Sequence, residues 1–251
     1  MLGLGSNISK TGKLGVHDLG IVTSNLVLKH NYDLSSVQLL SDGAGYFANN
    51  GYIDCGTDSN LAIGNGNCTM SAWVYSDDFT ANYGYVLAIG NDAAGESFGF
   101  GVRSNQGMFV SAYSNPIVET AFDVPEGVWN HIAVVYTGGA TDEAAFYCNG
   151  VLVETESIAT NVTTGKITIG SNVASTGQFD TGYICNVGIW EAALDQAEVK
   201  SIMNKNYAGL TSSEKEDLVS WWNLDEETRT NGTAGIGGVK DYHSTNHGTL
   251  S

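Results

Sequence analysis

Proline, basic residues and long apolar runs are all scarce in this sequence. It has 2 prolines but 32 glycines in 251 residues, a turn-rich composition that suits many short strands better than helices. Lys and Arg number 10 against 27 Asp and Glu, for a net charge of -17. This charge repels phosphate backbones and anionic membranes, so nucleic acid is not an expected partner. Cations and neutral sugars remain compatible ligands.

Membrane-spanning and targeting segments are also missing from the pattern. No apolar stretch approaches transmembrane length, so membrane insertion is not expected. Residues 1–8 lack a basic segment followed by an apolar one, so we expect synthesis in the cytoplasm without a signal peptide. The cysteines lie in strand-like runs without CxxC spacing and are predicted to be buried thiols rather than disulfides or metal ligands. They are Cys55, Cys68, Cys148 and Cys185.

The strongest local signal is Asn149-Gly150, which lies between apolar runs. Residues 129–136 and 146–148 precede it, and residues 151–153 follow it. A tight primed turn needs positive φ at both central residues, which Asn and Gly adopt. Such a turn would pair Cys148 with Val151 and Phe146 with Val153, placing four apolar side chains on one face. The sequence therefore predicts an antiparallel sheet with one buried side.

Further strand patterns recur at short intervals along the chain. In 68–75, Cys68, Met70, Ala72 and Val74 alternate with other residues, and in 182–190 the set Tyr183, Cys185, Val187 and Ile189 is predicted to share a face. A capping-box pattern at Asp195 and Glu198 predicts one short helix, and a second is expected near Ser212. Many short strands with almost no helix predict an all-β, two-sheet antiparallel sandwich with one or two short helices. The other expected strands lie at 25–28, 46–47, 52–53, 85–89, 98–102, 108–113 and 166–170.

The glycine-spaced segment 1–24 is set apart from the single predicted domain, residues 25–251. Its apolar residues favour an arm that docks on a neighbouring subunit, and an unstructured tail is the alternative. The arm residues are Leu2, Leu4, Leu14, Leu19 and Ile21.

Seven motifs in order resemble the laminin-G-like, concanavalin A-like jelly-roll family, in its pentraxin-related branch. The resemblance covers roughly residues 45–205 and implies a jelly-roll sandwich. The segments that carry it are 52–56, 69–74, 129–136, 147–150, 167–170, 182–190 and 195–203.

The chain departs from the family pattern in two places. The aromatic strand and the Asp…Asn-x-Gly-Thr-Leu loop that usually open the family's domain are found here at 221–226 and 241–250. This order resembles a permuted arrangement, which is feasible when chain ends lie close together. Where many relatives carry an acidic pair, this chain has Cys185-Asn186, which weakens a calcium site built from that strand.

The N-terminal arm leading into residues 25–30 is similar to structural proteins of tailed phages, especially marine ones. The similarity implies a place in the virion and assembly with other virion proteins and with copies of the chain itself.

Calcium binding is considered for the C-terminal loop because hard cations prefer several oxygen ligands. Asp241 and Asn246 lie in one Ser/Thr/Asn-rich loop, Asn186 would approach it by analogy with the family, and Asp225 is a further candidate. The alternative is an Asx-turn loop held by its own hydrogen bonds.

Sugar contacts and catalysis lead to two further predictions. Tyr83, Tyr85 and Tyr113 lie near loops and are candidates for stacking on sugar rings, whereas Trp129, Trp190 and Trp222 are predicted to be core. Glu154 and Glu156 would lie about 6.6 Å apart on one strand face, a workable distance for glycoside hydrolysis. Solvated charges are the favoured interpretation of this pair, and no catalytic residue is predicted.

The sequence thus favours a non-enzymatic virion structural protein, exposed on a phage capsid or tail. It would assemble through its arm and present loops to cell-surface glycans. A soluble calcium-dependent lectin or adhesin is the alternative, and a glycoside hydrolase is the least favoured class.

Overall fold

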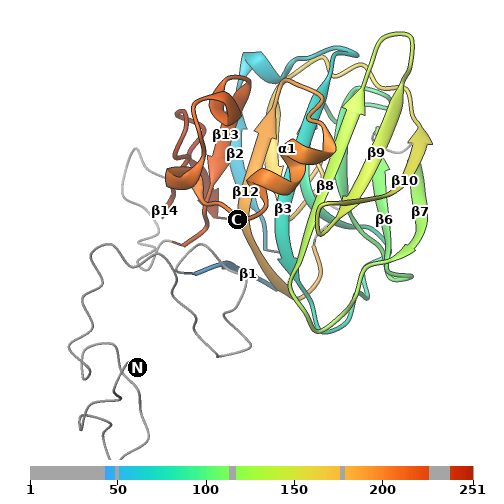
Figure 1. The fold of residues 1–251 in the computed structure, drawn as a ribbon, viewed down its shortest axis with the longest axis vertical. Helices are drawn as coiled ribbons and strands as arrows, with labels where there is room; N and C mark the ends of the chain where they lie inside the picture. The colour runs from blue at the N-terminus through green and yellow to red at the C-terminus, as the bar shows by residue number, and fades with distance from the viewer. Residues whose placement is uncertain (1–42, 49–50, 113–116, 176–178, 226–237, 251) are drawn as a thin grey trace, which may run out of the picture. The chain divides into compact units, whose positions relative to one another are not determined.

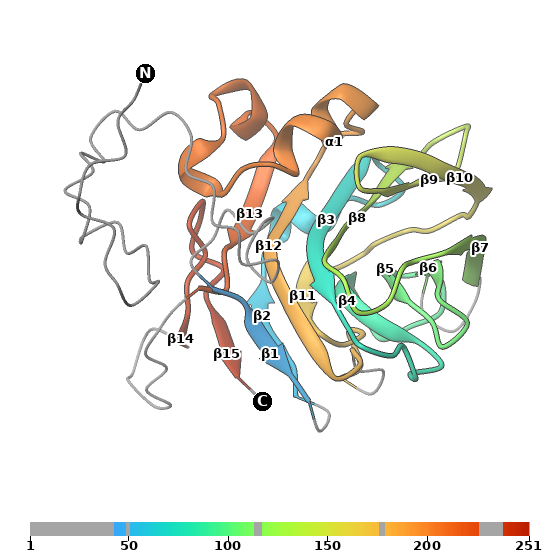
Figure 2. The same ribbon diagram turned by 60° about the horizontal axis from the view of Figure 1, so that its bottom comes forward.

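The described residues form two antiparallel β-sheets that are stacked face to face (Figures 1 and 2). The structure is a computed structural model that describes residues 43–48, 51–112, 117–175, 179–225 and 238–250. The predicted all-β sandwich with short helices is confirmed. The arm, 1–24, and the strand expected at 25–28 lie outside the described residues.

Sheet A has seven strands in the order β1-β12-β3-β8-β9-β10, with β13 also paired to β12. Because β1 pairs with 182–184 and β13 with 187–190, the two lie along the same edge of β12 at different heights. The strands are β1 (Gly45–Phe47), β3 (Cys68–Tyr75), β8 (Asn130–Thr137), β9 (Glu143–Cys148), β10 (Val151–Ser157), β12 (Gly182–Trp190) and β13 (Leu218–Trp222).

Sheet B has eight strands in the order β14-β15-β2-β11-β4-β5-β6-β7. The strand β7 was not expected from the sequence, because its residues show no sustained alternation of buried and exposed types. The strands are β2 (Ile53–Thr57), β4 (Gly84–Gly90), β5 (Ser97–Val102), β6 (Gly107–Ser111), β7 (Ile117–Asp123), β11 (Lys166–Ile169), β14 (Gly238–Val239) and β15 (Gly248–Leu250).

The core fills the space between the two sheets with side chains from both. In β3 the predicted inward set, Cys68, Met70, Ala72 and Val74, is wholly buried in it. Trp222 also lies there, whereas the buried Trp190 packs in a separate cluster against Trp221. All four cysteines are buried and form no disulfide with one another, as predicted.

The β9–β10 hairpin has the predicted turn but not the predicted register. Asn149 and Gly150 have φ of 50° and 74°, and Cys148 pairs with Val151. A β-bulge between Leu152 and Glu154 then places Phe146 opposite Glu154 instead of Val153. The expected run of four buried apolar residues is wrong, because Val151 is 53% exposed.

In β12 the predicted shared face is confirmed for Val187 and Ile189 but is wrong for Tyr183, again because of a bulge. The register shifts between Cys185 and Gly188, and Asn186 has φ of 48°, the left-handed region that Asn tolerates better than most residues. Ile184, Val187 and Ile189 therefore face the core. Tyr183 points to the outer face and is 40% exposed.

A single α-helix among the described residues, α1 (Gln196–Ile202), lies over the outer face of sheet A (Figure 1). Asp195 caps it, and Glu198 returns a hydrogen bond to complete the predicted capping box. Val199 packs against Ala133, Val135 and Tyr147 of the sheet. Three short 3-10 helices, η1 (Ser59–Leu61), η2 (Tyr207–Gly209) and η3 (Ser213–Lys215), complete the helical structure. No described helix has the length and apolarity needed to cross a bilayer.

Candidate functional site

Four aromatic side chains lie next to one another on the outer face of sheet A. Tyr46 on β1 pairs with Tyr183 on β12, and Tyr183 pairs with Tyr75 on β3. Trp129 directly precedes Asn130, the first residue of β8, which pairs with Val74. The ring centroids are 5.1 Å apart for Tyr46 and Tyr183, 6.0 Å for Tyr183 and Tyr75, and 5.7 Å for Tyr75 and Trp129. Trp129 also lies 6.2 Å from Tyr183, so Tyr183, Tyr75 and Trp129 contact one another. We call these four residues the aromatic row.

The row lies where the outer face of sheet A is open to solvent. Tyr46 is 55% exposed, and Val128 beside Trp129 is 48% exposed. The next outward ring along β3, Trp73, is only 4% exposed, because the segment after α1 covers it and the Met203 carbonyl accepts its indole N–H at 2.8 Å. The α1 region therefore covers one end of the sheet face and leaves the row uncovered.

Two local features of the sequence build the row. The bulge at Asn186 separates the outward Tyr183 from the inward residues farther along β12, and Gly182 lets β12 approach β3 closely. A Cβ on Gly182 would lie 2.1 Å from the carbonyl oxygen of Tyr75. Only glycine therefore permits the approach that sets Tyr183 beside Tyr75 without displacing the backbone.

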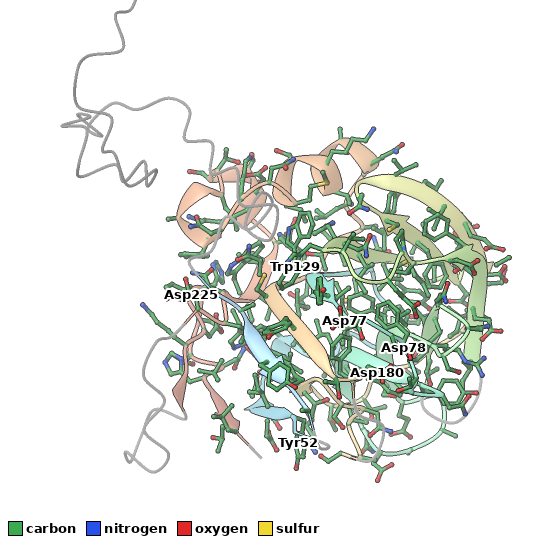
Figure 3. The ribbon with its side chains drawn as sticks, turned by 90° about the horizontal axis from the view of Figure 1, so that it is seen from below. Tyr52, Asp77, Asp78, Trp129, Asp180 and Asp225 are labelled. Carbon is green, nitrogen blue, oxygen red and sulfur yellow. The ribbon has the colours of Figure 1, made fainter. Side chains whose placement is uncertain are left out.

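Two exposed carboxylates flank the row in the loop after β3 (Figure 3). Asp77 accepts a hydrogen bond from the Tyr75 hydroxyl at 2.7 Å. This hydrogen bond is the main reason why the pKa of Tyr75 is raised above its ordinary value. Asp78 follows directly and is also exposed to solvent.

Hydrogen bonds tie together the three loops that carry these groups. The Ser76 hydroxyl donates to the Asp78 and Thr181 carbonyls, both at 3.0 Å, and the Ser76 carbonyl accepts from the Gly127 N–H at 2.8 Å. Asp180, labelled in Figure 3, is 7% exposed and accepts hydrogen bonds from the Thr80 hydroxyl and from the backbone N–H of Ala81. The loops that carry Trp129, Asp77 and Asp78 are therefore held to one another.

This arrangement has the chemistry of a sugar-binding surface. Exposed ring faces are electron-rich and attract the C–H groups of an apolar ligand face, and carboxylate oxygens accept hydrogen bonds from hydroxyls. Tyrosine and tryptophan bring a large contact area at a small cost in side-chain entropy. The row and Asp77 and Asp78 thus offer both kinds of contact on one surface.

The predicted stacking residues lie elsewhere and are less available. Tyr85 is 6% exposed, with its ring 4.9 Å from that of Phe109, so it is a packed side chain rather than a free stacking face. Tyr83 is half-buried, with the Arg103 guanidinium 4.5 Å from its ring centroid. Tyr113 lies outside the described residues. Trp129, predicted to be core, is instead partly exposed in the row.

The predicted calcium loop is held by its own hydrogen bonds. Asp241 is 2% exposed, and its oxygens accept from the N–H groups of Trp221, His243, Ser244 and Asn246 and from the Ser244 hydroxyl. Burial alone would raise the pKa of Asp241, but these hydrogen bonds lower it below its ordinary value. The geometry matches the Asx-type loop, the alternative to a calcium site.

The other predicted calcium ligands do not join Asp241. The Asn246 amide donates to Asp58 and to Ser220, and Asp225 accepts from Asn223 and from Tyr242, both at 3.3 Å. Within the described ranges, no three His, Cys, Asp or Glu residues are grouped so that they could hold a metal ion. Asn186 is buried at the bulge, and its side-chain amide has no hydrogen-bond partner.

In the carboxylate pair on β10, Glu154 has a structural role because it accepts a hydrogen bond from the backbone. Glu154 accepts the backbone N–H of Ala121 at 2.8 Å, joining β10 to β7 at the side of the sandwich. Glu156 is half-buried on the same strand. This role accounts for Glu154 without catalysis.

Sequence reasoning missed the row because its members come from four separate segments. Tyr46, Tyr75 and Tyr183 each lie within a predicted strand, but strand pairing in space is not visible from alternation. The usable signal was Asn186, since Asn within an otherwise apolar strand marks a candidate bulge. Allowing a bulge there would have turned Tyr183 outward.

Comparisons with known proteins agree with this architecture. The sequence model of the concanavalin A-like lectin/glucanases superfamily matches residues 47–200. A protein of known structure from Bacteroides ovatus, described as carbohydrate-binding, has 18% identity and a TM-score of 0.61. The alignment covers 83% of this chain and 57% of that protein, so the chain spans a little over half of its length.

Two further solved structures are similar over part of the chain. A heptameric SAP-like pentraxin from Limulus polyphemus has 16% identity and a TM-score of 0.46, with 66% of this chain and 78% of that chain covered. The NanB sialidase from Streptococcus pneumoniae has 19% identity and a TM-score of 0.48, with 63% and 27% covered. None of the curated proteins matches this sequence.

Proposed function

The chain belongs to the concanavalin A-like lectin/glucanases superfamily, and we propose that it is a non-enzymatic carbohydrate-binding domain whose binding surface is the aromatic row. The observation that carries this proposal is the cross-strand register of Tyr46, Tyr183 and Tyr75, which aligns three tyrosine rings on an open sheet face. Monomeric proteins rarely leave such side chains grouped and exposed without a ligand. The carbohydrate-binding description of the Bacteroides ovatus protein supports the same function class.

Binding without catalysis accords with the acids that surround the row. Glycoside hydrolysis needs two carboxyl groups on either side of the scissile bond. Asp77 and Asp78 are adjacent in one loop, and Asp180 is engaged with Thr80. The hollow beside α1 is lined by Asp195, Gln196, Ala197 and Lys200 and contains a single acid.

A glycan microarray tests the proposal directly. The wild-type domain is expected to bind immobilised glycans, and Tyr183→Ala and Trp129→Ala are expected to weaken binding about tenfold, the effect of removing a large aromatic contact. Tyr83→Ala is the matched control, because Tyr83 is a partly buried tyrosine outside the row. Loss of binding in Tyr83→Ala alone would place the sugar site where the sequence first suggested it.

Calcium separates this proposal from the alternative of a calcium-dependent lectin. Stacking on the row needs no metal ion, so binding is expected to be the same with EDTA as with added calcium. Binding that disappears in EDTA and returns with calcium would favour the alternative.

If the row served as a contact between copies of the chain, the protein would form oligomers in solution through it. Analytical ultracentrifugation of the wild type and of Tyr183→Ala would then give different association states. Binding of glycans by a monomer supports the proposal, whereas a dimer lost in Tyr183→Ala together with an empty array contradicts it.

The setting of the domain on a phage particle is a finer proposal that rests on the arm, residues 1–24. Several copies on one particle would raise the weak affinity of a single sugar site through multivalency. Mass spectrometry of purified particles should detect the chain, and deletion of residues 1–24 should abolish its incorporation. Unchanged incorporation after the deletion would refute docking through the arm.

A further inference from the structure

We infer that the aromatic row binds several consecutive rings of a linear, neutral glycan, and that the acids beside it reject acidic sugars. This inference rests on the proposed function and adds the class of ligand. Three features carry it, namely the length of the row, the openness of its ends and the charge around it.

The aromatic row is longer than one sugar ring. The Tyr183 centroid lies 5.1 Å from that of Tyr46 and 6.2 Å from that of Trp129, so the two end rings are at most about 11 Å apart. Tyr75 lies beside both Tyr183 and Trp129, at 6.0 and 5.7 Å. A surface of this length offers aromatic contacts to more than one ring of an extended ligand.

Among the described residues, exposed side chains mark both ends of the row. Tyr46 lies on the edge strand β1 and is the most exposed member. At the other end, Val128 beside Trp129 is also exposed. Internal segments of a longer glycan can therefore lie across the row and continue past its ends.

The charge beside the row is negative. Asp77 and Asp78 are exposed, and Glu126, which accepts the Phe79 N–H at 2.9 Å, is half-buried in the neighbouring loop. In a chain with a net charge of -17, a second carboxylate on the ligand would meet like charge at short range. Neutral sugars meet no such repulsion, and their hydroxyls donate to the same carboxylates.

The described cations are engaged elsewhere. Arg103 contacts Asn82, Glu119 and Tyr83, and Lys166 donates to the Val173 carbonyl. Lys200 is on α1, Lys205 pairs with Glu214, Lys215 lies over Tyr207 and Lys240 over Tyr242. The contacts given above for the described cations thus lie away from the row and from Asp77 and Asp78.

The test uses the full chain on an array that carries linear neutral, branched and acidic glycans, followed by titration of the best neutral oligosaccharide at each available length. We expect preference for linear neutral glycans and an affinity that rises from two rings to the length that fills the row. Discrimination against acidic glycans should be on the order of tenfold at low salt and weaker at high salt.

Variants at the ends and the middle of the row separate length from simple stacking. Tyr46→Ala and Trp129→Ala should reduce affinity for the longest oligosaccharide more than for the shortest, whereas Tyr183→Ala should reduce both. Asp78→Asn should raise the ratio of acidic to neutral binding about tenfold. Circular dichroism and thermal melting of each variant show that the fold is retained.

The outcomes distinguish the inference from the proposed function. If no glycan on the array is bound, the proposed function fails. If glycans are bound but acidic ones are preferred, or affinity is the same from two rings to the longest chain, the inference is overturned while the proposed function stands.

Discussion

Replacement of Asp241 by alanine is expected to destabilise the protein strongly, because this carboxylate organises the C-terminal loop. Its Oδ1 accepts from the N–H groups of Trp221 at 3.0 Å, His243 at 2.9 Å and Ser244 at 3.2 Å. Its Oδ2 accepts from the Ser244 hydroxyl at 2.5 Å and from the Asn246 N–H at 3.2 Å. The loop thereby joins β13 in sheet A to β15 in sheet B.

The magnitude follows from the donors that would lose their acceptor. Each buried donor left without a partner costs about 1–3 kcal/mol, and hydrogen bonds to a charged group are at the upper end. The half-exposed His243 and Ser244 can recruit water, so the five losses do not add fully. We expect Asp241→Ala to lower the free energy of unfolding by about 3–5 kcal/mol, and Asp241→Asn by about 2 kcal/mol, because its amide keeps one acceptor oxygen.

The effect should depend on pH in one direction. The pKa of Asp241 is lower in the folded protein than in the unfolded chain, where it is about 3.9. Its stabilising contribution is therefore present above the unfolded pKa and is lost as pH falls through the lower folded value. The difference in stability between wild type and Asp241→Asn should be largest near pH 7 and should shrink below about pH 4.

Urea unfolding followed by tryptophan fluorescence at several pH values measures these differences. Asp92→Asn is the matched control, since Asp92 is exposed and its replacement should change stability by less than about 0.5 kcal/mol. A loss below about 1 kcal/mol in Asp241→Ala, or a difference that grows in acid, would show that the hydrogen bonds do not carry the stability assigned to them.

Three further predictions concern buried groups. Burial lowers the pKa of His131 to about 3, so the stability that its neutral form provides above about pH 6.5 is lost as the pH falls toward 3. Urea unfolding should therefore give a free energy of unfolding about 2 kcal/mol lower at pH 5 than at pH 7. The loss should be smaller in His131→Gln, which has no group that titrates at this position. Burial raises the pKa of Cys68 to about 12 and that of Cys148 to about 11. A thiol reagent should therefore label the cysteines in denaturant but not in the native protein. Fast labelling of the native protein would contradict their burial. Gly182→Ala should cost about 1–3 kcal/mol in a thermal melt and weaken glycan binding, because its Cβ would lie 2.1 Å from the Tyr75 carbonyl oxygen; unchanged stability would refute this close approach.

The sequence predicted well wherever one element alone determines the structure. The alternation in β3 correctly identified the buried side, and Asn149-Gly150 correctly identified the turn. The capping box at Asp195 correctly placed the start of α1. Each of these signals depends on residues that are close in the sequence, so neither pairing partners nor tertiary contacts were needed to interpret them.

Predictions failed where a strand departs from strict alternation. Bulges near Val153 and at Asn186 insert one residue and move the following side chains to the opposite face. The buried carboxylate of Asp241 shows a related limit, because its five donors come from a loop and from a strand about 20 residues away in sequence. Composition suggests oxygen ligands there, but only the geometry shows that those oxygens already accept hydrogen bonds.

The aromatic row combines both situations, which explains why it could not be predicted from the sequence. Tyr75 is the final residue of a correctly predicted strand, whereas Tyr183 was predicted to share a face with Val187 and Ile189, and the bulge at Asn186 separates them. Their direct pairing with each other and with Tyr46 depends on the strand order of sheet A. Since the segment that follows α1 covers Trp73 on the same face, the exposed part of the sheet is decided by how far α1 and this segment extend. A binding surface of this kind is thus a product of topology and coverage, and mutations at Gly182 should change it as surely as mutations in the rings.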